Sequence, residues 1–318
     1  MHSRLTNPGR VLATAAAISA LAVPAAAGAA EQADLRVEGS SKTLAAATYV
    51  TDTAKIRTTT APPTCNGTGA TKTVSGPTAI GLLASAAGAT SALTPFAVSD
   101  EFDFGLLVCG IGDLAGTGTD AFWLYKVDHK SPEVGADQYA LKGGEEVLWY
   151  YSDSTAGSNV GDELAVTAPA RAKAGASVNV TVYAYDAAGA RKPAAGASVG
   201  GQTTDAAGKA TVTAPARGTL RLRATRAGDI RSATAPVCVA KVLKRCASRH
   251  GKRLFGTDAA DRLAGTGGSD TILARGGADR ISVRGGAVDL VRCGKGRDRV
   301  TADRKDRVGR DCEIVKRR

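Results

Sequence analysis

The chain of 318 residues has few of the side chains that usually carry catalysis or base stacking. Its histidines are His2, His129 and His250, and no metalloprotease, serine-hydrolase or phosphate-loop motif occurs. Beyond Ala240 the one aromatic residue is Phe255, so the basic tail lacks a platform on which bases could stack. These absences predict a protein that is not an enzyme and that does not bind nucleic acid.

A long apolar run is found only near the start of the chain. Two arginines precede the run from Val11 to Val23, and alanine and glycine follow it. This pattern predicts a secretory signal over residues 1–29. The run is shorter than the roughly 20 residues of a spanning helix, so we expect no transmembrane anchor. The protein is therefore expected to be secreted and extracellular, with attachment to a cell surface as an option.

The six cysteines never form the C-x-x-C pair that is typical of zinc sites. In a secreted chain, cysteines are expected to form disulfides. Many pairings are compatible with six cysteines, and loop closure costs least when both partners belong to one segment. The predicted disulfides are Cys65–Cys109, Cys238–Cys246 and Cys293–Cys312.

Charge and aromatic content change along the chain. Residues 31–163 are acidic and hold eleven of the fourteen aromatic residues, whereas residues 164–240 and 241–318 are basic. Such shifts in composition indicate at least three folding units after the signal. We place them at 30–162, 163–240 and 241–318.

Aspartate recurs about every nine residues in the last unit, each time two positions before an aliphatic residue. The repeated aspartates are Asp261, Asp270, Asp279, Asp289, Asp298 and Asp306. Each repeat is expected to form one short strand and one turn, so that two repeats complete one coil of a parallel β-roll with the aliphatic side chains inside. Glycines before the aspartates permit tight turns because a positive φ costs glycine little.

These repeats resemble the hemolysin-type calcium-binding repeat, G-G-x-G-x-D-x-aliphatic-x, over residues 254–308. The resemblance implies that turns stacked on one side hold calcium between aspartates and backbone carbonyls. One side would use Asp261, Asp279 and Asp298, and the other would use Asp270, Asp289 and Asp306. Arginine follows four of these aspartates and repels a cation. The alternative is a solenoid that has lost calcium and is closed by Cys293–Cys312.

Residues 34–162 mix strand patterns with one helical pattern, at 77–88 after Pro77. Phe104-Gly105, Trp123 and the stretch GADQYALKGGEEVLWYY at 135–151 resemble the C-terminal domain of transcobalamin and intrinsic factor. They also resemble bacterial relatives of that domain whose function is unassigned. The resemblance implies a small, mainly β domain that helps to cap cobalamin.

Four aromatic residues are the candidate ligand surface of this unit. They are Trp123, Tyr125, Trp149 and Tyr151. Apolar faces with polar rims suit corrin-like or sugar-like ligands. The alternative is that both tryptophans belong to a small aromatic core. We expect His129 to lie in a loop.

Alternating runs separated by glycine, proline and aspartate fill residues 163–240 and predict an antiparallel β-sandwich. The stretch TTDAAGKATV resembles the bacterial immunoglobulin-like and carboxypeptidase-regulatory modules of surface proteins. That resemblance implies a spacer.

The sequence therefore predicts a mainly β, multidomain protein: a small α+β domain, an antiparallel immunoglobulin-like sandwich and a short parallel β-roll. We expect a secreted binding or cell-surface-associated protein with a degenerate calcium-binding tail. The basic tail favours anionic cell-envelope polymers as partners. The alternative function is binding of a corrinoid such as cobalamin, or of another small ligand, through the N-terminal domain.

Overall fold

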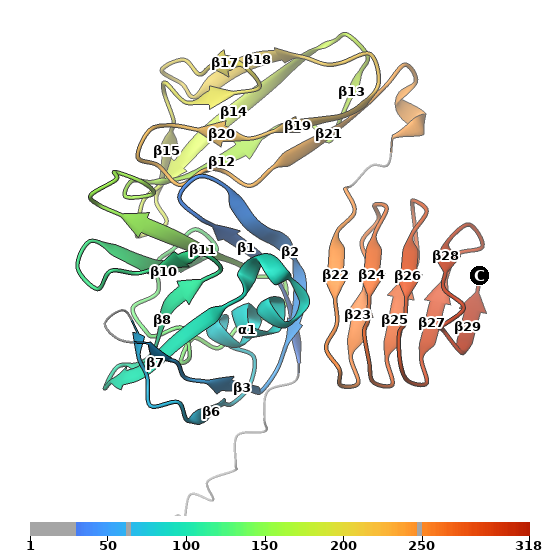
Figure 1. Cartoon of the computed structure of the whole chain (residues 1–318). Coiled ribbons are helices and arrows are strands. Elements are labelled where there is room, and N and C mark those ends of the chain that lie inside the picture. Colours follow the sequence, from blue (N-terminus) through green and yellow to red (C-terminus); the bar gives the residue numbers. More distant parts are fainter. Residues whose placement is uncertain (1–29, 62–64, 247–249) are drawn as a thin grey trace, which may run out of the picture.

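The computed structural model describes residues 30–61, 65–246 and 250–318; the predicted signal lies outside these ranges. The described chain is mainly β-strand, and its strands build several β-rich units (Figure 1). The predicted fold class is therefore confirmed. None of the described helices is long and apolar enough to cross a membrane.

The N-terminal unit is built on a sheet in the order β10-β11-β1-β2, in which β1 pairs with β11 in parallel. These strands are β1 (Glu31–Glu38), β2 (Thr43–Thr51), β10 (Ala121–Val127) and β11 (Glu146–Asp153). Smaller sheets complete the unit, formed by β3 (Ala54–Arg57) with β6 (Thr71–Val74), β4 (Thr60–Ala61) with β5 (Cys65–Asn66), and β7 (Phe96–Phe102) with β8 (Gly105–Ile111) and β9 (Leu114–Ala115). Helix α1 (Ala79–Ala89) and the short helix η1 (Ser91–Leu93) belong to the same unit.

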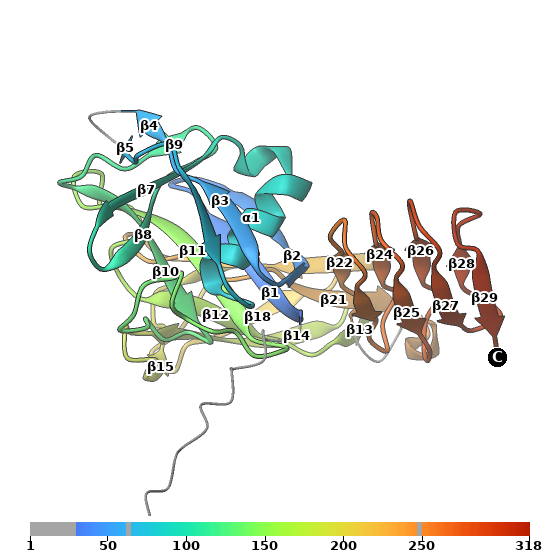
Figure 2. The same cartoon turned by 90° about the horizontal axis from the view of Figure 1, so that it is seen from below.

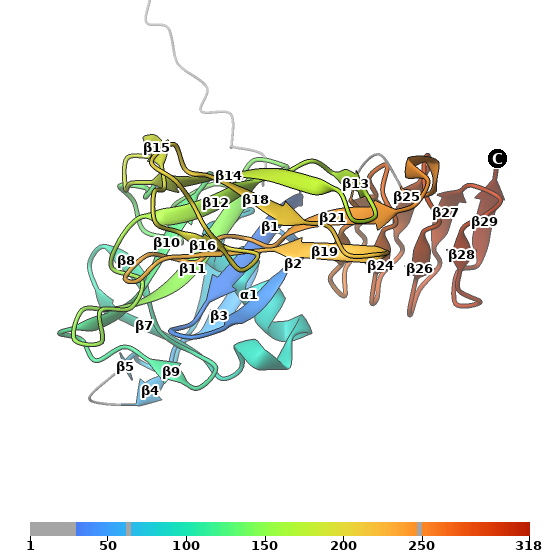
Figure 3. The same ribbon diagram turned by 90° about the horizontal axis from the view of Figure 1, so that it is seen from above.

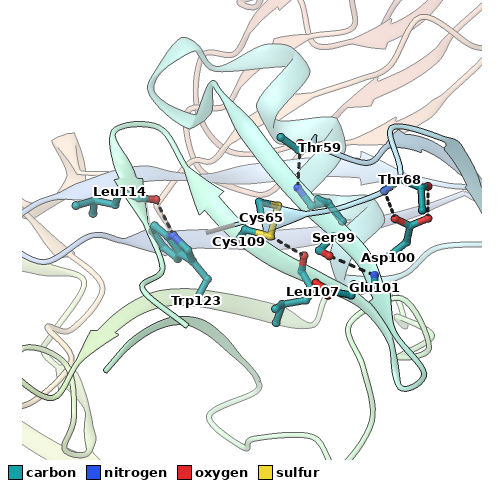
Figure 4. Close-up of a disulfide and its surroundings, with 11 residues drawn as sticks. Thr59, Cys65, Thr68, Ser99, Asp100, Glu101, Leu107, Cys109, Leu114 and Trp123 are labelled. Atoms are coloured by element: carbon teal, nitrogen blue, oxygen red, sulfur yellow. Dashed lines mark hydrogen bonds between the residues drawn. A yellow bond between two sulfur atoms is a disulfide. The ribbon is translucent and has the colours of Figure 1, made fainter. Parts of the chain in front are cut away.

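Helix α1 begins where the sequence predicts a helix start. The hydroxyl of Thr78 accepts a hydrogen bond from the N–H of Gly81 at 3.1 Å, which caps the helix directly after Pro77. Ile80 and Leu83 are fully buried in the core of the unit, because their spacing places them on the same side of the helix. The Cys65–Cys109 disulfide ties β5 to β8 in this unit (Figure 4).

The middle unit is a sandwich of short sheets that are mainly antiparallel, with one parallel pair between β13 and β21. Val178, Val180 and Val182 alternate along β14 with exposed or half-buried residues, and all three valines are buried. The strands are β12 (Glu163–Thr167), β13 (Arg171–Lys173), β14 (Ser177–Tyr185), β15 (Arg191–Pro193), β16 (Ser198–Val199), β17 (Gln202–Thr203), β18 (Lys209–Thr213), β19 (Gly218–Leu222), β20 (Ala224–Thr225) and β21 (Ala235–Ala240). The short helix η2 (Leu243–Arg245) follows, and Cys238 and Cys246 form the second disulfide.

The last unit is a parallel solenoid in which two repeats complete each coil, as predicted. One face consists of β22 (Arg253–Phe255), β24 (Thr271–Leu273), β26 (Leu290–Arg292) and β28 (Arg307–Val308). The other consists of β23 (Arg262–Ala264), β25 (Arg280–Val283), β27 (Arg299–Ala302) and β29 (Ile314–Arg317). Aliphatic residues from equivalent positions stack between the faces, and the Cys293–Cys312 disulfide lies in this core.

The solenoid continues the sheet of the N-terminal unit, a connection that the composition of the chain did not predict. Strand β2 pairs in parallel with β22 through Thr48–Leu254 and Tyr49–Phe255, which creates one sheet of eight strands. The rings of Tyr49 and Phe255 stack with their centroids 5.0 Å apart. This pairing covers the edge that the first coil would otherwise expose. The solenoid extends away from the body (Figures 2 and 3).

A buried charge cluster joins the N-terminal unit to the sandwich. The Arg36 guanidinium lies 2.5 Å from the Glu163 carboxylate of β12, and Glu38 pairs with Arg231 of the sandwich at 2.9 Å. His129 Nδ1 is 3.0 Å from Glu163, and the His129 ring stacks on Tyr185. The Glu163 contact raises the pKa of His129. His129 thus lies in a turn, as predicted, and also links two units.

Candidate functional site

The structure brings the six repeat aspartates together in two columns of three. In one column, the N–H of Asp261 donates to Asp279 Oδ1, and the N–H of Asp279 donates to Asp298 Oδ1, both at 2.8 Å. In the other column, the N–H of Asp270 donates to Asp289 Oδ1 at 2.8 Å, and the N–H of Asp289 donates to Asp306 Oδ1 at 3.1 Å. Each side chain is at most 5% exposed. One carboxylate oxygen therefore links each coil to its neighbour.

The second carboxylate oxygen is satisfied in some repeats and not in others. A threonine four residues earlier serves this oxygen in two repeats: the Thr257 N–H donates to Asp261, and the Thr266 N–H donates to Asp270. Three other repeats carry Arg275, Gly285 and Gly294 at that position, each with a positive φ. In these three repeats the buried Oδ2 atoms of Asp279, Asp289 and Asp298 have no hydrogen-bond partner within the described ranges.

Two of these carboxyl groups, those of Asp279 and Asp289, bind protons more tightly than ordinary aspartates do. Burial, reinforced by the carboxyl groups above and below, raises the pKa of Asp279 to about 6. The same causes raise the pKa of Asp289 to about 6. A charged oxygen without a partner is costly to bury, so the ionised forms of Asp279 and Asp289 destabilise the folded solenoid relative to the protonated forms.

The oxygens of the columns do not fit a calcium cage as they are arranged. Calcium takes about six to eight oxygen ligands. The turn carbonyls of Thr257 and Arg275, however, accept hydrogen bonds from the N–H groups of Gly276 and Lys295 in the next turn, at 3.1 and 2.8 Å. In the described part of the chain, no group of three or more His, Cys, Asp or Glu residues is placed to hold a metal ion. Calcium binding stays a prediction, and the arrangement favours the metal-free alternative.

Close stacking of the turns also explains the glycines that precede the repeated aspartates. A Cβ atom on Gly296 would collide with the carbonyl oxygen of Gly277 in the neighbouring coil. Gly296 has a φ of 141°, which non-glycine residues rarely adopt. The glycine motif is therefore required by backbone contact between turns, whether or not metal is bound.

Burial of the aspartates changes the surface charge of the solenoid. Residues 250–318 contain seventeen basic and ten acidic side chains. Six of the ten acidic residues are the column aspartates, and all six are buried. The outer surface of the solenoid is therefore more cationic than its net sequence charge indicates.

The aromatic residues predicted to bind a ligand lie mainly in the core of the N-terminal unit. Trp123 and Trp149 are each 3% exposed. Trp123 Nε1 donates to Leu114 O at 3.0 Å (Figure 4), and the Tyr151 hydroxyl donates to Ala115 O at 3.0 Å. The Tyr125 ring stacks on Trp149 with centroids 5.3 Å apart. Most of this aromatic surface stabilises the fold.

A groove beside this core has a volume of about 430 Å³. Three of the four predicted residues, Trp123, Tyr125 and Trp149, line it, whereas Tyr151 does not. The groove also includes Phe104 and Leu124, which are 55% and 43% exposed and were not predicted. Alternation along β10 could have placed Leu124 on the outer face, but sequence alone could not bring Phe104 beside it.

Comparison with known proteins identifies one family. Residues 78–153 match a family described as Domain of unknown function (DUF4430). This segment includes α1 and the strands that form the aromatic groove. No curated protein and no solved structure matches the chain.

Proposed function

We propose that this chain is a secreted, non-enzymatic binding protein that attaches to an anionic cell envelope through its solenoid. The observation that carries this proposal is the separation of charge in the last unit: its repeat aspartates are buried, and its arginines and lysines lie mostly at the surface. Attraction of this kind raises the local concentration of polyanions and speeds association.

The arrangement of the units supports the proposal. The solenoid extends from the body (Figure 1), and its first strand borders a pocket that Arg221 and Pro236 of the sandwich also line. Three disulfides are compatible with an extracellular location. The sandwich is joined to the N-terminal unit by the buried charge cluster of Arg36 and Glu163, and it serves as a spacer with a fixed orientation relative to that unit.

Retention of the full mature chain on isolated cell envelopes tests this function. We expect retention at low ionic strength and release as salt increases, because salt screens exposed charges. A chelator should leave retention unchanged if the solenoid needs no metal. Absence of retention at low ionic strength would refute the proposal, and loss of retention with chelator would instead support the calcium prediction.

A second function, binding of a small ligand, is favoured by the groove of the N-terminal unit. Trp149 lines the groove, and its buried Nε1–H has no hydrogen-bond acceptor among the described residues. An unpaired buried donor favours a ligand that carries an acceptor oxygen. Absorbance titration with cobalamin tests the corrinoid form of this proposal. A Leu124→Arg variant, which places charge in the groove, should abolish any saturable change.

A further inference from the structure

One face of the solenoid carries a column of arginines. Arg262, Arg280 and Arg299 are direct partners in the pairing of β23 with β25 and of β25 with β27. All three side chains are exposed, and the residue after each arginine is a buried aliphatic residue. Neighbouring strands lie about 4.8 Å apart, so the three guanidinium groups project from the face at a regular, short spacing.

The side chains of the three arginines have no partner among the residues that the structure describes. None of them forms an ion pair or a side-chain hydrogen bond with any residue in the described ranges. Other arginines of the solenoid do have partners: Arg275 lies 3.6 Å from Asp258, and Arg317 donates to the backbone carbonyl of Asp303. Like charges directly opposite one another on paired strands destabilise a sheet. An anionic ligand would remove this repulsion.

Hydroxyl groups lie beside the arginine column on the same face. Ser282 and Thr301 stand two residues after Arg280 and Arg299, and they are themselves partners in the pairing of β25 with β27. Residues two apart on a strand point to the same side, so each of these coils presents one guanidinium and one hydroxyl. Lys316 of β29 is the next partner, beside Thr301. Guanidinium groups bind oxyanions through two parallel hydrogen bonds, and a neighbouring hydroxyl can add a third.

The opposite face lacks such a column. The equivalent register there runs Arg253, Thr271, Leu290 and Arg307, so the two arginines are separated by uncharged residues. The Arg253 guanidinium also lies over the Phe255 ring, 5.3 Å from its centroid. Charge on the solenoid is therefore organised on one face and scattered on the other.

We propose that the column of Arg262, Arg280 and Arg299 is the binding surface for one chain of a linear anionic glycopolymer, whose successive phosphate or carboxylate groups lie along the stacking direction of the coils. This inference rests on the proposed attachment to an envelope and assigns the residues and the ligand chemistry. A sugar-based chain suits a face with arginines and hydroxyls and without exposed aromatic rings, whereas nucleic acid is normally held by base stacking as well.

The test compares two full-length variants that each lose three positive charges. One carries Arg262→Gln, Arg280→Gln and Arg299→Gln on the proposed face. The control carries Arg253→Gln, Arg292→Gln and Arg307→Gln on the opposite face, where the arginines are also exposed. The probes are a poly(glycerol phosphate) teichoic polymer and a polyuronate, immobilised separately, with affinity measured as a function of salt. The two probes distinguish phosphate from carboxylate as the preferred oxyanion.

We expect the column variant to bind the preferred polymer at least about tenfold more weakly than the control variant does. A direct charge-assisted hydrogen bond contributes more to the affinity than the general electrostatic attraction of a charged surface. The slope of log affinity against log salt should fall by about two to three for the column variant. A variant with lysine at the three column positions keeps the charge and loses the bidentate geometry, so its affinity should be intermediate. Thermal unfolding at a temperature no lower than that of the unmutated protein confirms that the exposed substitutions preserve the fold.

The outcomes separate this inference from the proposed function. Equal weakening by the column and control variants would overturn the column as a site while leaving envelope attachment in place. Failure of the unmutated protein to bind either polymer, despite retention on envelopes, would overturn the glycopolymer as partner. Tighter binding of single-stranded DNA than of both polymers, lost in the column variant, would replace the glycopolymer with nucleic acid. Failure to bind envelopes at all would refute the proposed function itself.

Discussion

Replacement of Asp279 by asparagine tests whether hydrogen bonds or metal hold the solenoid. Oδ1 of Asp279 accepts the Asp261 N–H, while the buried Oδ2 has no partner within the described ranges. Asparagine keeps the Oδ1 acceptor and removes the charge, and its Nδ2 takes the buried position of Oδ2. Asp279→Asn should therefore stabilise the solenoid at neutral pH, whereas removal of a calcium ligand would weaken a metal-dependent solenoid.

The size of the effect follows from the pKa of Asp279, which burial raises from 3.8 to about 6. The folded state then binds the proton more tightly than the unfolded state does. The contribution of Asp279 to stability is therefore fully present below about pH 4 and is lost as the pH rises through about 6. A shift of this size corresponds to at most about 3 kcal/mol, so we expect Asp279→Asn to gain about 1–3 kcal/mol near neutral pH and nothing below pH 4.

Asp279→Ala provides the matched comparison. Alanine also removes the charge, but it leaves the buried N–H of Asp261 without an acceptor, which costs about 1–3 kcal/mol relative to asparagine. Unfolding would be followed by hydrogen exchange of solenoid peptides, in EDTA and in millimolar calcium, across acidic to neutral pH. Hydrogen exchange is needed because a protein of several units need not unfold in one step.

Two results would refute this reasoning. Asp279→Asn could prove less stable than the unmutated protein in EDTA at neutral pH, which would mean that the charged carboxylate is favourable where it lies. Alternatively, calcium could stabilise the unmutated protein and fail to stabilise Asp279→Asn. Because a ligand stabilises only the state that binds it, the second result would establish a calcium site at the column.

Three further predictions concern the interface between the N-terminal unit and the sandwich, and the disulfide of the solenoid. Glu163→Gln should destabilise the contact between the N-terminal unit and the sandwich by about 3–5 kcal/mol in thermal unfolding, because it leaves the buried Arg36 without its closest counter-ion. The hydrogen bond with Glu163 raises the pKa of His129. The stability that the His129–Glu163 pair contributes should therefore be present below pH 6.5 and disappear as the pH rises through the folded-state pKa of His129. His129→Asn should remove this pH dependence. Replacing Cys293 and Cys312 together by serine should cost about 3 kcal/mol and raise hydrogen exchange in the last coils, whereas unchanged exchange would show that the disulfide adds nothing.

Much of the fold could be predicted because local patterns carry it. The nine-residue period of aspartate and aliphatic residues gives two repeats per coil, and the period-two alternation of Val178, Val180 and Val182 gives a half-buried strand. Helix α1 begins beside Pro77 because the capping residue is a neighbour in sequence. The three disulfides connect the predicted cysteines, since each pair belongs to one segment.

The candidate sites depended on contacts that no local pattern contains. The sequence identified the repeat aspartates and the aromatic residues, but it could not show that the columns accept backbone N–H groups or that Trp123 and Trp149 are core residues. A carboxylate with the spacing of a metal ligand and one that links two coils look alike in sequence. Only the position of the neighbouring coil distinguishes them.

Sequence alone determined the period of the solenoid, the strand patterns of the sandwich and the excess of positive charge, because each depends on neighbours along the chain. It favoured, without determining, the cysteine pairs that the structure contains. Tertiary structure decided how the units join: β2 continues into β22 across about two hundred residues, and Arg36 meets Glu163 at a buried interface. It also decided which charged residues lie at the surface of the solenoid. Folding buries the aspartates and leaves Arg262, Arg280 and Arg299 exposed in one column, because coiling aligns residues that are eighteen or nineteen positions apart.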